Sequence, residues 1–117
     1  MSLNLNKLLI AGHLTRDPEL RYTPKGAAAC SFGLASNRIY RDGDGNKQET
    51  TLFIDVNTWG SNAESCHKYL VKGRNVVIDG RLEFDSWTDD DGNKRSKHKI
   101  TADLVHFLGI PKKDGDE

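Results

Sequence analysis

The stretch SNAESCHKYLVKG, residues 61–73, predicts a short helix. Ser61 and Glu64 have the spacing of a capping box, in which a hydroxyl and a carboxylate satisfy the first backbone N–H groups. Gly73 can end the helix, because glycine readily adopts the left-handed backbone of a C-cap. An apolar stripe follows from helical spacing and consists of Ala63, Cys66, Tyr69 and Leu70. This helix therefore has one face to bury.

The sequence on both sides of the helix predicts β-strands. Apolar residues alternate or form brief runs between clusters of Gly, Pro and Asp, and no internal repeat is present. We expect three strands before the helix and two after it, at residues 6–15, 27–40, 50–59, 75–87 and 95–108. The pattern indicates an all-β protein with a single helix.

This element order predicts the fold. Three strands, a helix and two strands is the order of an OB-fold, a five-stranded Greek-key barrel with one short helix between strands 3 and 4. A generic β-sandwich is the alternative, but the helix favours the barrel, because there it can cover one open end. The 117 residues suffice for one domain, expected at residues 1–109. Residues 110–117 are rich in Pro, Gly and charged residues, which predicts a disordered tail.

Composition limits the classes of function. Seventeen basic residues balance seventeen acidic ones, so no net field attracts duplex DNA or a membrane surface. The two cysteines are too few for a disulfide framework, and the four histidines lack metal-ligand spacing, so we expect no metal and no cofactor. The first apolar run is too short for a signal peptide or a membrane span, which predicts a cytoplasmic protein.

Two acidic stretches resemble calcium loops but predict hairpin tips. In RIYRDGDGNKQETTLFI, residues 38–54, a loop that starts at Asp42 needs Gly where Lys47 stands and Glu where Phe53 stands. In TDDDGNKR, residues 88–95, Lys94 again replaces the glycine. Asp-Gly pairs between strand-like runs are typical of hairpins. The first tip is long enough to fold over a bound strand, so we expect it also to be a binding loop.

The alternation within strands predicts which side chains face outward. In TLFIDVNTWG, residues 51–60, the apolar face is Leu52, Ile54 and Val56, which puts Phe53, Asp55, Asn57 and Trp59 on the other. In NVVIDGRLEFDSW, residues 75–87, the apolar face is Val76, Ile78, Leu82 and Phe84. The opposite face there carries Asp79, Arg81, Glu83, Asp85 and Trp87. Three large aromatic rings thus face away from the predicted core.

Outward rings near cations predict a surface for unpaired nucleic acid. Bases stack on planar rings while basic side chains follow the phosphates, and the candidate cations are Arg38, Arg41, Arg81, Lys97 and Lys99. The alternative is that the rings pack under a loop or in a subunit contact. Tyr40 shares the even numbering of the core residues Phe32 and Leu34, so it reaches this surface only through a bulge or beyond the end of the barrel.

The chain also resembles a known family. NKLLIAGHLTRDPELRYTPKGAAACSFGLAS, residues 6–36, is similar to the opening of bacterial single-stranded DNA-binding proteins. The likeness continues through FIDVNTWG, YLVKGRNVVIDGRL, SWTDDDGNKR and ITADLVHFLG, so it covers about residues 6–109. The combination is specific although each piece alone is weak. The resemblance implies sequence-independent binding of single-stranded DNA in replication, recombination and repair.

The resemblance also implies site residues and partners. The stacking aromatics of the family fall on Tyr40, Phe53, Trp59 and Trp87, and the first two stand where many relatives have tryptophan, which implies weaker binding. A homotetramer is implied, built as two dimers whose first strands pair. The family recruits replication and repair proteins through an acidic, apolar tail. Here Lys112 and Lys113 offset the acidic residues after Pro111, so we expect no such recruitment.

Two other classes of function stay open at this stage. OB barrels also carry nucleases, and Asp55, Asp79 and Asp103 lie on three late strands where they could hold a divalent metal. Carboxylates paired with cations such as Arg81 or Lys99 are the structural alternative. An OB adaptor that binds protein and RNA is the third class, since rings stack on RNA bases as well.

Overall fold

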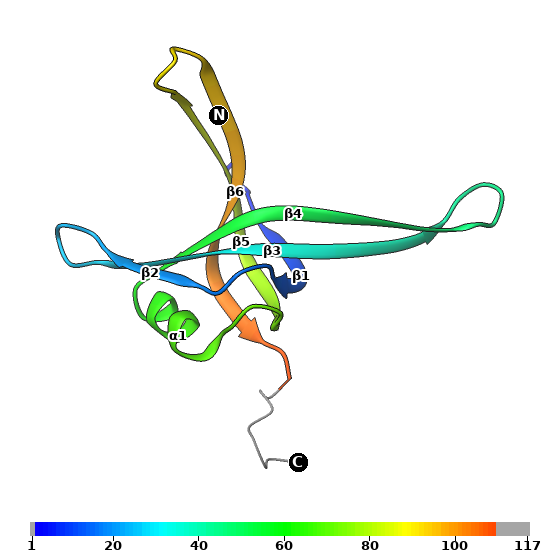
Figure 1. Cartoon of the computed structure of the whole chain (residues 1–117), viewed down its shortest axis with the longest axis horizontal. Helices are drawn as coiled ribbons and strands as arrows, with labels where there is room; N and C mark the ends of the chain where they lie inside the picture. The colour runs from blue at the N-terminus through cyan, green and yellow to red at the C-terminus, as the bar shows by residue number, and fades with distance from the viewer. Residues whose placement is uncertain (1, 110–117) are drawn as a thin grey trace.

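Two long hairpins dominate the structure, a computed structural model that describes residues 2–109 (Figure 1). β3 (Ala28–Arg41) and β4 (Lys47–Trp59) form one, and β5 (Asn75–Thr88) and β6 (Lys94–Phe107) form the other. A 14-residue strand is about 46 Å long, which exceeds the height of a small barrel. The radius of gyration is accordingly 17.0 Å, against about 13 Å for a compact chain of this length. Both hairpins therefore project from the body.

The body is a closed five-stranded barrel. The strand order is β1-β5-β6-β4-β3, and β1 (Leu8–Leu14) closes it by pairing with β3 at His13 and Leu14. β4 and β6 are parallel and the other pairs are antiparallel. This Greek-key arrangement with one helix is the predicted OB-fold, and the five predicted strands match the observed ones to within a few residues. The expected tail lies outside the described residues.

A sixth strand escaped the sequence prediction. β2 (Glu19–Tyr22) is four residues long and pairs with the start of β3, from Ala28 to Ser31. A strand this short has too few residues for alternation to be recognised. It forms because β3 offers an unpaired edge beside it, which is a tertiary cause.

Closure of the barrel depends on a glycine. A Cβ atom at Gly12 would overlap the carbonyl oxygen of Ala35 on β3 and contact the Leu34 side chain. Only a residue without a side chain lets β1 and β3 approach this closely. Gly12 is therefore the residue that lets β1 close the barrel against β3.

The core lies inside the barrel and under α1 (Ser61–Tyr69). Its largest fully buried side chains include Phe32, Leu14, Leu34, Ile78, Ile100, Val56 and Val76. The helix buries Ala63 and Cys66, and Leu70 follows it into the core. Tyr69 departs from the predicted stripe: it is half exposed and its ring lies 6.3 Å from that of Phe107. The helix thus covers one end of the barrel.

The predicted helix ends are wrong. Gly60 is the N-cap, with φ of 68°, and no side chain caps the helix, so Ser61 and Glu64 do not form a capping box. The chain needs this glycine to turn from β4 into the helix, which leaves Ser61 already helical. At the other end Leu70 is the C-cap. Gly73 lies in the following turn, where its N–H donates to the Leu14 carbonyl at 2.8 Å.

Three residues predicted for the core are exposed instead. Leu52, Leu82 and Phe84 have exposed fractions of 51%, 40% and 59%. Their alternation is preserved. Leu52 and Phe84 pair with Ser36 and His98, toward the projecting parts of the two hairpins, whereas Leu82 pairs with the buried Ile100 at the margin of the core. The alternation of apolar and polar residues in a long strand therefore continues beyond the barrel.

Both acidic stretches are hairpin tips, as predicted. The Oδ1 atom of Asp42 accepts the N–H groups of Asp44 and Asn46, each at 2.9 Å. Asp89 repeats the arrangement with Asp91 at 3.0 Å and Asn93 at 2.9 Å. Each aspartate therefore uses its carboxylate to hold the turn. Within residues 2–109, no helix has the length and apolar character needed to cross a membrane.

Candidate nucleic-acid interface

Three strands combine into one continuous outer face. The parallel register sets Asp55 beside Lys99 and Asn57 beside Thr101, while β5 sets Glu83 opposite Lys99. Paired residues lie on the same side of a sheet. What we call the outer face comprises Phe53, Asp55, Asn57, Trp59, Arg81, Glu83, Asp85, Trp87, Lys97, Lys99 and Thr101. It contains six of the nine site residues predicted from the sequence.

The three aromatic rings predicted to face outward are exposed on this face. Phe53, Trp59 and Trp87 have exposed fractions of 71%, 50% and 46%. Phe53 and Trp59 lie on β4, and Trp87 lies on the projecting part of β5 opposite Arg95. None of the three belongs to the core cluster of the described residues. Each ring is thus available to stack against a flat ligand.

Tyr40 and its neighbours lie elsewhere. The β3–β4 ladder runs from Ala29 to Arg41 without a register shift, so no bulge moves Tyr40 off the even-numbered side. The β3–β4 hairpin projects from the barrel toward its tip (Figure 1), and Tyr40, next to the last residue of β3, is half-buried. The Arg38 guanidinium lies 4.6 Å from the centroid of the Tyr40 ring. Arg41 donates to the Gly45 carbonyl at 2.9 Å. Arg38 and Tyr40 therefore lie on the opposite side of the β3–β4 hairpin from Phe53, whereas Arg41 lies on the same side as Phe53.

The cations of the outer face are all paired with carboxylates. Lys97 Nζ lies 2.6 Å from Asp55 Oδ2, and Lys99 Nζ lies 2.8 Å from Asp85 Oδ2. Arg81 contacts Glu83 and Asp103, each at 3.1 Å. The hydrogen bond from Lys97 holds the pKa of Asp55 below its ordinary value. A phosphate that binds here must compete with these carboxylates.

Arg16 is a cation of this region that the sequence interpretation missed. It follows β1 in a segment without strand alternation, so no face could be assigned to it. The structure places its NH1 atom 3.4 Å from Asp55 Oδ1. The only available signal was its charge directly after an apolar strand.

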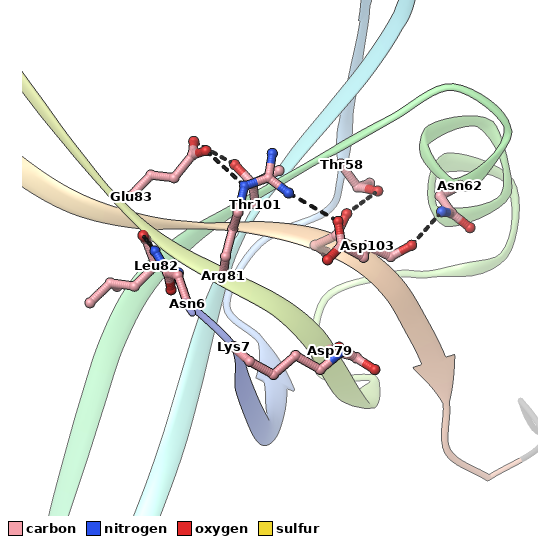
Figure 2. A network of polar contacts seen from close by, with 11 residues as sticks. Asn6, Lys7, Thr58, Asn62, Asp79, Arg81, Leu82, Glu83, Thr101 and Asp103 are labelled. Carbon is pink, nitrogen blue, oxygen red and sulfur yellow. Dashed lines mark hydrogen bonds and ion pairs between the residues drawn. The ribbon is translucent and has the colours of Figure 1, made fainter. Parts of the chain in front are cut away.

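A β-bulge organises the end of the outer face nearest the helix. Between Gly80 and Asp79 the β6 partner skips Asp103, which makes Asp103 an extra residue. Figure 2 shows Asn62 of α1 donating to the Asp103 carbonyl at 2.8 Å, and Thr58 donating to the carbonyl of Ala102 at 3.3 Å. The backbone groups freed by the bulge are therefore satisfied by side chains.

The aspartates of the nuclease alternative are all engaged with cations. Asp55 contacts Arg16 and Lys97, Asp103 contacts Arg81, and Lys7 Nζ lies 2.6 Å from Asp79 Oδ1 (Figure 2). Across residues 2–109 there is no group of three or more His, Cys, Asp or Glu side chains arranged to hold a metal ion. The arrangement of these aspartates favours the structural interpretation of their ion pairs.

The sequence matches the model of the single-strand binding protein family over residues 5–108. The chain belongs to this family. Among relatives, a single-stranded DNA-binding protein of Helicobacter hepaticus is 49% identical over 112 residues, which are 96% of this chain and 65% of that protein. One from Wolinella succinogenes is 47% identical over 88% of this chain and 64% of its own length. The chain spans less than two thirds of the length of these curated relatives.

Solved structures agree with family membership. A deletion mutant of the single-stranded DNA-binding protein from Thermus aquaticus has a TM-score of 0.80 and 33% identity, covering 90% of this chain and 51% of that one. The Plasmodium falciparum SSB in complex with single-stranded DNA has a TM-score of 0.84 at 24% identity, covering 93% and 99%. The second likeness concerns the fold alone. Both share the barrel fold of this chain, and the first, at 33% identity, agrees with its family membership.

Proposed function

We propose that this chain binds single-stranded DNA without reading its sequence, and protects it during replication, recombination and repair. One observation carries the proposal: Phe53, Trp59 and Trp87 are exposed on a single face that also carries Arg81, Lys97 and Lys99. Stacking does not depend on base identity, because every base has a flat face. Membership of the single-strand binding protein family supports the same ligand. Chromosomal single strands would place the protein in the cytoplasm, at the nucleoid.

The bound strand would follow the outer face. Its bases stack on the three rings at about 1 to 3 kcal/mol each. Its phosphates contact Lys97, Lys99 and Arg81, while Tyr40, Arg38 and Arg41 extend the path along the β3–β4 hairpin. Because each of these lysines and arginines already has a polar or aromatic partner, phosphates exchange with existing contacts. Stacking therefore supplies most of the affinity in this mechanism.

The active form in this proposal is a homotetramer of two dimers. The support is the edge of β1: its pairing with β3 is limited to His13 and Leu14, so from Leu8 to Gly12 one edge has no partner strand among the described residues. Leu9 on this strand has an exposed fraction of 69%. A second copy of β1 would cover both the edge and the apolar side chain.

A binding assay tests the proposal against its alternatives. Labelled single-stranded DNA and RNA of the same sequence are incubated with the protein and Mg²⁺, then separated on native and denaturing gels. We expect a mobility shift with DNA, no cleavage, and a fall in Trp59 and Trp87 fluorescence as poly-pyrimidine strands bind. Cleavage would support the nuclease, and a shift with RNA alone would support the adaptor. Unchanged emission during a clear shift would remove the two rings from the mechanism.

A further inference from the structure

Arg16, Asp55 and Lys97 form a cluster in the middle of the outer face, and they come from three separate segments. Arg16 follows β1, Asp55 lies on β4 and Lys97 lies on β6. One oxygen of the Asp55 carboxylate accepts from Arg16 at 3.4 Å, and the other accepts from Lys97 at 2.6 Å. One anion thus bridges two cations, and the cluster has one positive charge in excess.

The space around the cluster is shaped for a larger group than a carboxylate. A hollow of about 270 Å³ lies between Arg16, Phe53, Asp55 and Lys97. A second hollow of about 260 Å³ shares Arg16, Asp55 and Lys97 and is also lined by Asn57, Asp85 and Lys99. The cluster therefore separates two hollows, one beside the Phe53 ring and the other beside the Lys99–Asp85 ion pair.

Gly33 provides the room in which Arg16 lies. A Cβ atom at this position would overlap the Thr15 hydroxyl and lie 2.8 Å from Arg16 NH1. The bare backbone of β3 thus lets the guanidinium pass over the strand to reach Asp55. The Arg16 guanidinium consequently lies against the backbone of β3, with NH1 3.4 Å from Asp55 Oδ1.

A carboxylate and a phosphodiester present the same features to this pair of cations. Each has one negative charge and two equivalent oxygens that accept charge-assisted hydrogen bonds. Lys97 and Arg16 also hold the pKa of Asp55 below its ordinary value, so the carboxylate is ionised at neutral pH. Asp55 accordingly fills the position that a backbone phosphate would need.

We propose that Arg16 and Lys97 form a phosphate-binding site and that Asp55 occupies it in the free protein until a phosphate of the bound strand displaces it. The inference rests on the proposed function for the identity of its ligand. A phosphate gains the site most readily when its own base stacks on Phe53 beside it. Asp55 thus lowers the affinity of the site for anions that cannot stack on Phe53. The outer face therefore prefers single strands to other anions, although it carries cations.

The test compares two variants that lose the same charge. Asp55→Asn frees both cations, while Glu49→Gln removes a negative charge from the same face of β4 and has no ion pair within residues 2–109. Affinity for a dT oligonucleotide of about 16 nucleotides is measured by fluorescence anisotropy. We expect Asp55→Asn to bind about two- to tenfold more tightly than the parent chain, because surface ion pairs of this kind are weak. Glu49→Gln should change affinity less.

A double-mutant cycle locates the effect on Arg16. Arg16→Gln should weaken binding more in the Asp55→Asn background than in the parent chain, since the guanidinium is free only in the former. The inference is overturned if Asp55→Asn binds no more tightly than Glu49→Gln, or if Arg16→Gln costs nothing in either background. Thermal melts confirm that each variant is folded.

Failure of the proposed function is recognised separately. If the parent chain does not bind the oligonucleotide, the function is wrong, and the site itself is then tested with inorganic phosphate. NMR signals of the Arg16 side chain should shift at lower phosphate concentration in Asp55→Asn than in the parent chain. Equal shifts in the two proteins, or none in either, would reject the phosphate site.

Discussion

At the scale of the residue, the face on which an aromatic side chain lies decides its role. Phe53 and Phe84 have similar exposure, at 71% and 59%, but belong to opposite faces. Phe53 lies among the cations of the outer face, whereas Phe84 packs its ring 5.1 Å from that of His98 on the other side of the β5–β6 hairpin. Exposure alone therefore does not identify a stacking ring.

This difference predicts the effect of alanine substitutions. Phe53→Ala, Trp59→Ala and Trp87→Ala should each weaken single-strand binding by about 1 to 3 kcal/mol and leave the Tm nearly unchanged, because the rings are outside the core. Phe84→Ala is the matched control and should leave affinity unchanged. Anisotropy titrations and thermal melts measure both quantities. An equal loss of affinity in Phe84→Ala would contradict the assignment of the face.

The ion pairs of Asp55 predict a pH dependence. Because Lys97 and Arg16 depress its pKa in the folded state, Asp55 contributes stability above its unfolded value near 3.8, and this contribution is lost as pH falls through the lower folded value. As the pH is lowered from about 5 to about 2, the Tm of Asp55→Asn should therefore fall by less than the Tm of the parent chain. Parallel slopes for the two proteins would show that the ion pairs add nothing to folding.

At the scale of the element, strand length determines what each segment does. The first parts of β3 and β5 and the last parts of β4 and β6 build the barrel. The ends of these strands that meet at the two hairpin tips leave the barrel as two arms. The same alternation that buries Val56 exposes Leu52 on β4. Shorter strands would build only the barrel. The additional length of β3 to β6 extends the surface that a ligand can contact.

Closure of the barrel by β1 predicts a sharp contrast between two glycines. Gly12→Ala should lower the free energy of unfolding by about 1 to 3 kcal/mol, since its methyl group would overlap the Ala35 carbonyl of β3. Gly43→Ala is the control, because its Cβ would have no atom within 4 Å and its φ lies outside the left-handed region. Urea denaturation measures both. Similar stabilities of the two variants would show that β1 can shift without cost.

At the scale of the whole molecule, the basic and acidic residues balance, so the protein has no net charge. The outer face collects cations, and carboxylates of the same strands neutralise them. The core in turn contains two free thiols, Cys30 on β3 and Cys66 on α1. Because helix and barrel pack around these thiols, the thiols report on whether the two parts separate.

Burial raises the pKa of Cys30 to about 11 and that of Cys66 to about 12. Near pH 8 less than about one thiol in a thousand is then ionised, and neither is accessible. Both should resist alkylation in the native protein and react together once denaturant unfolds it, as mass spectrometry over a urea series would show. Labelling of Cys66 well before unfolding would indicate that α1 detaches independently of the barrel.

The sequence by itself determined the order of the five barrel strands and the helix along the chain, and the outward direction of Phe53, Trp59 and Trp87. These follow from local periodicity, which depends only on the geometry of a strand or helix. Tertiary structure decided the rest. It formed β2 on the edge of β3, exposed Leu52 and Phe84 where the hairpins project beyond the barrel, and brought Arg16 to Asp55. Such outcomes depend on contacts between segments far apart in the chain, which no local pattern records.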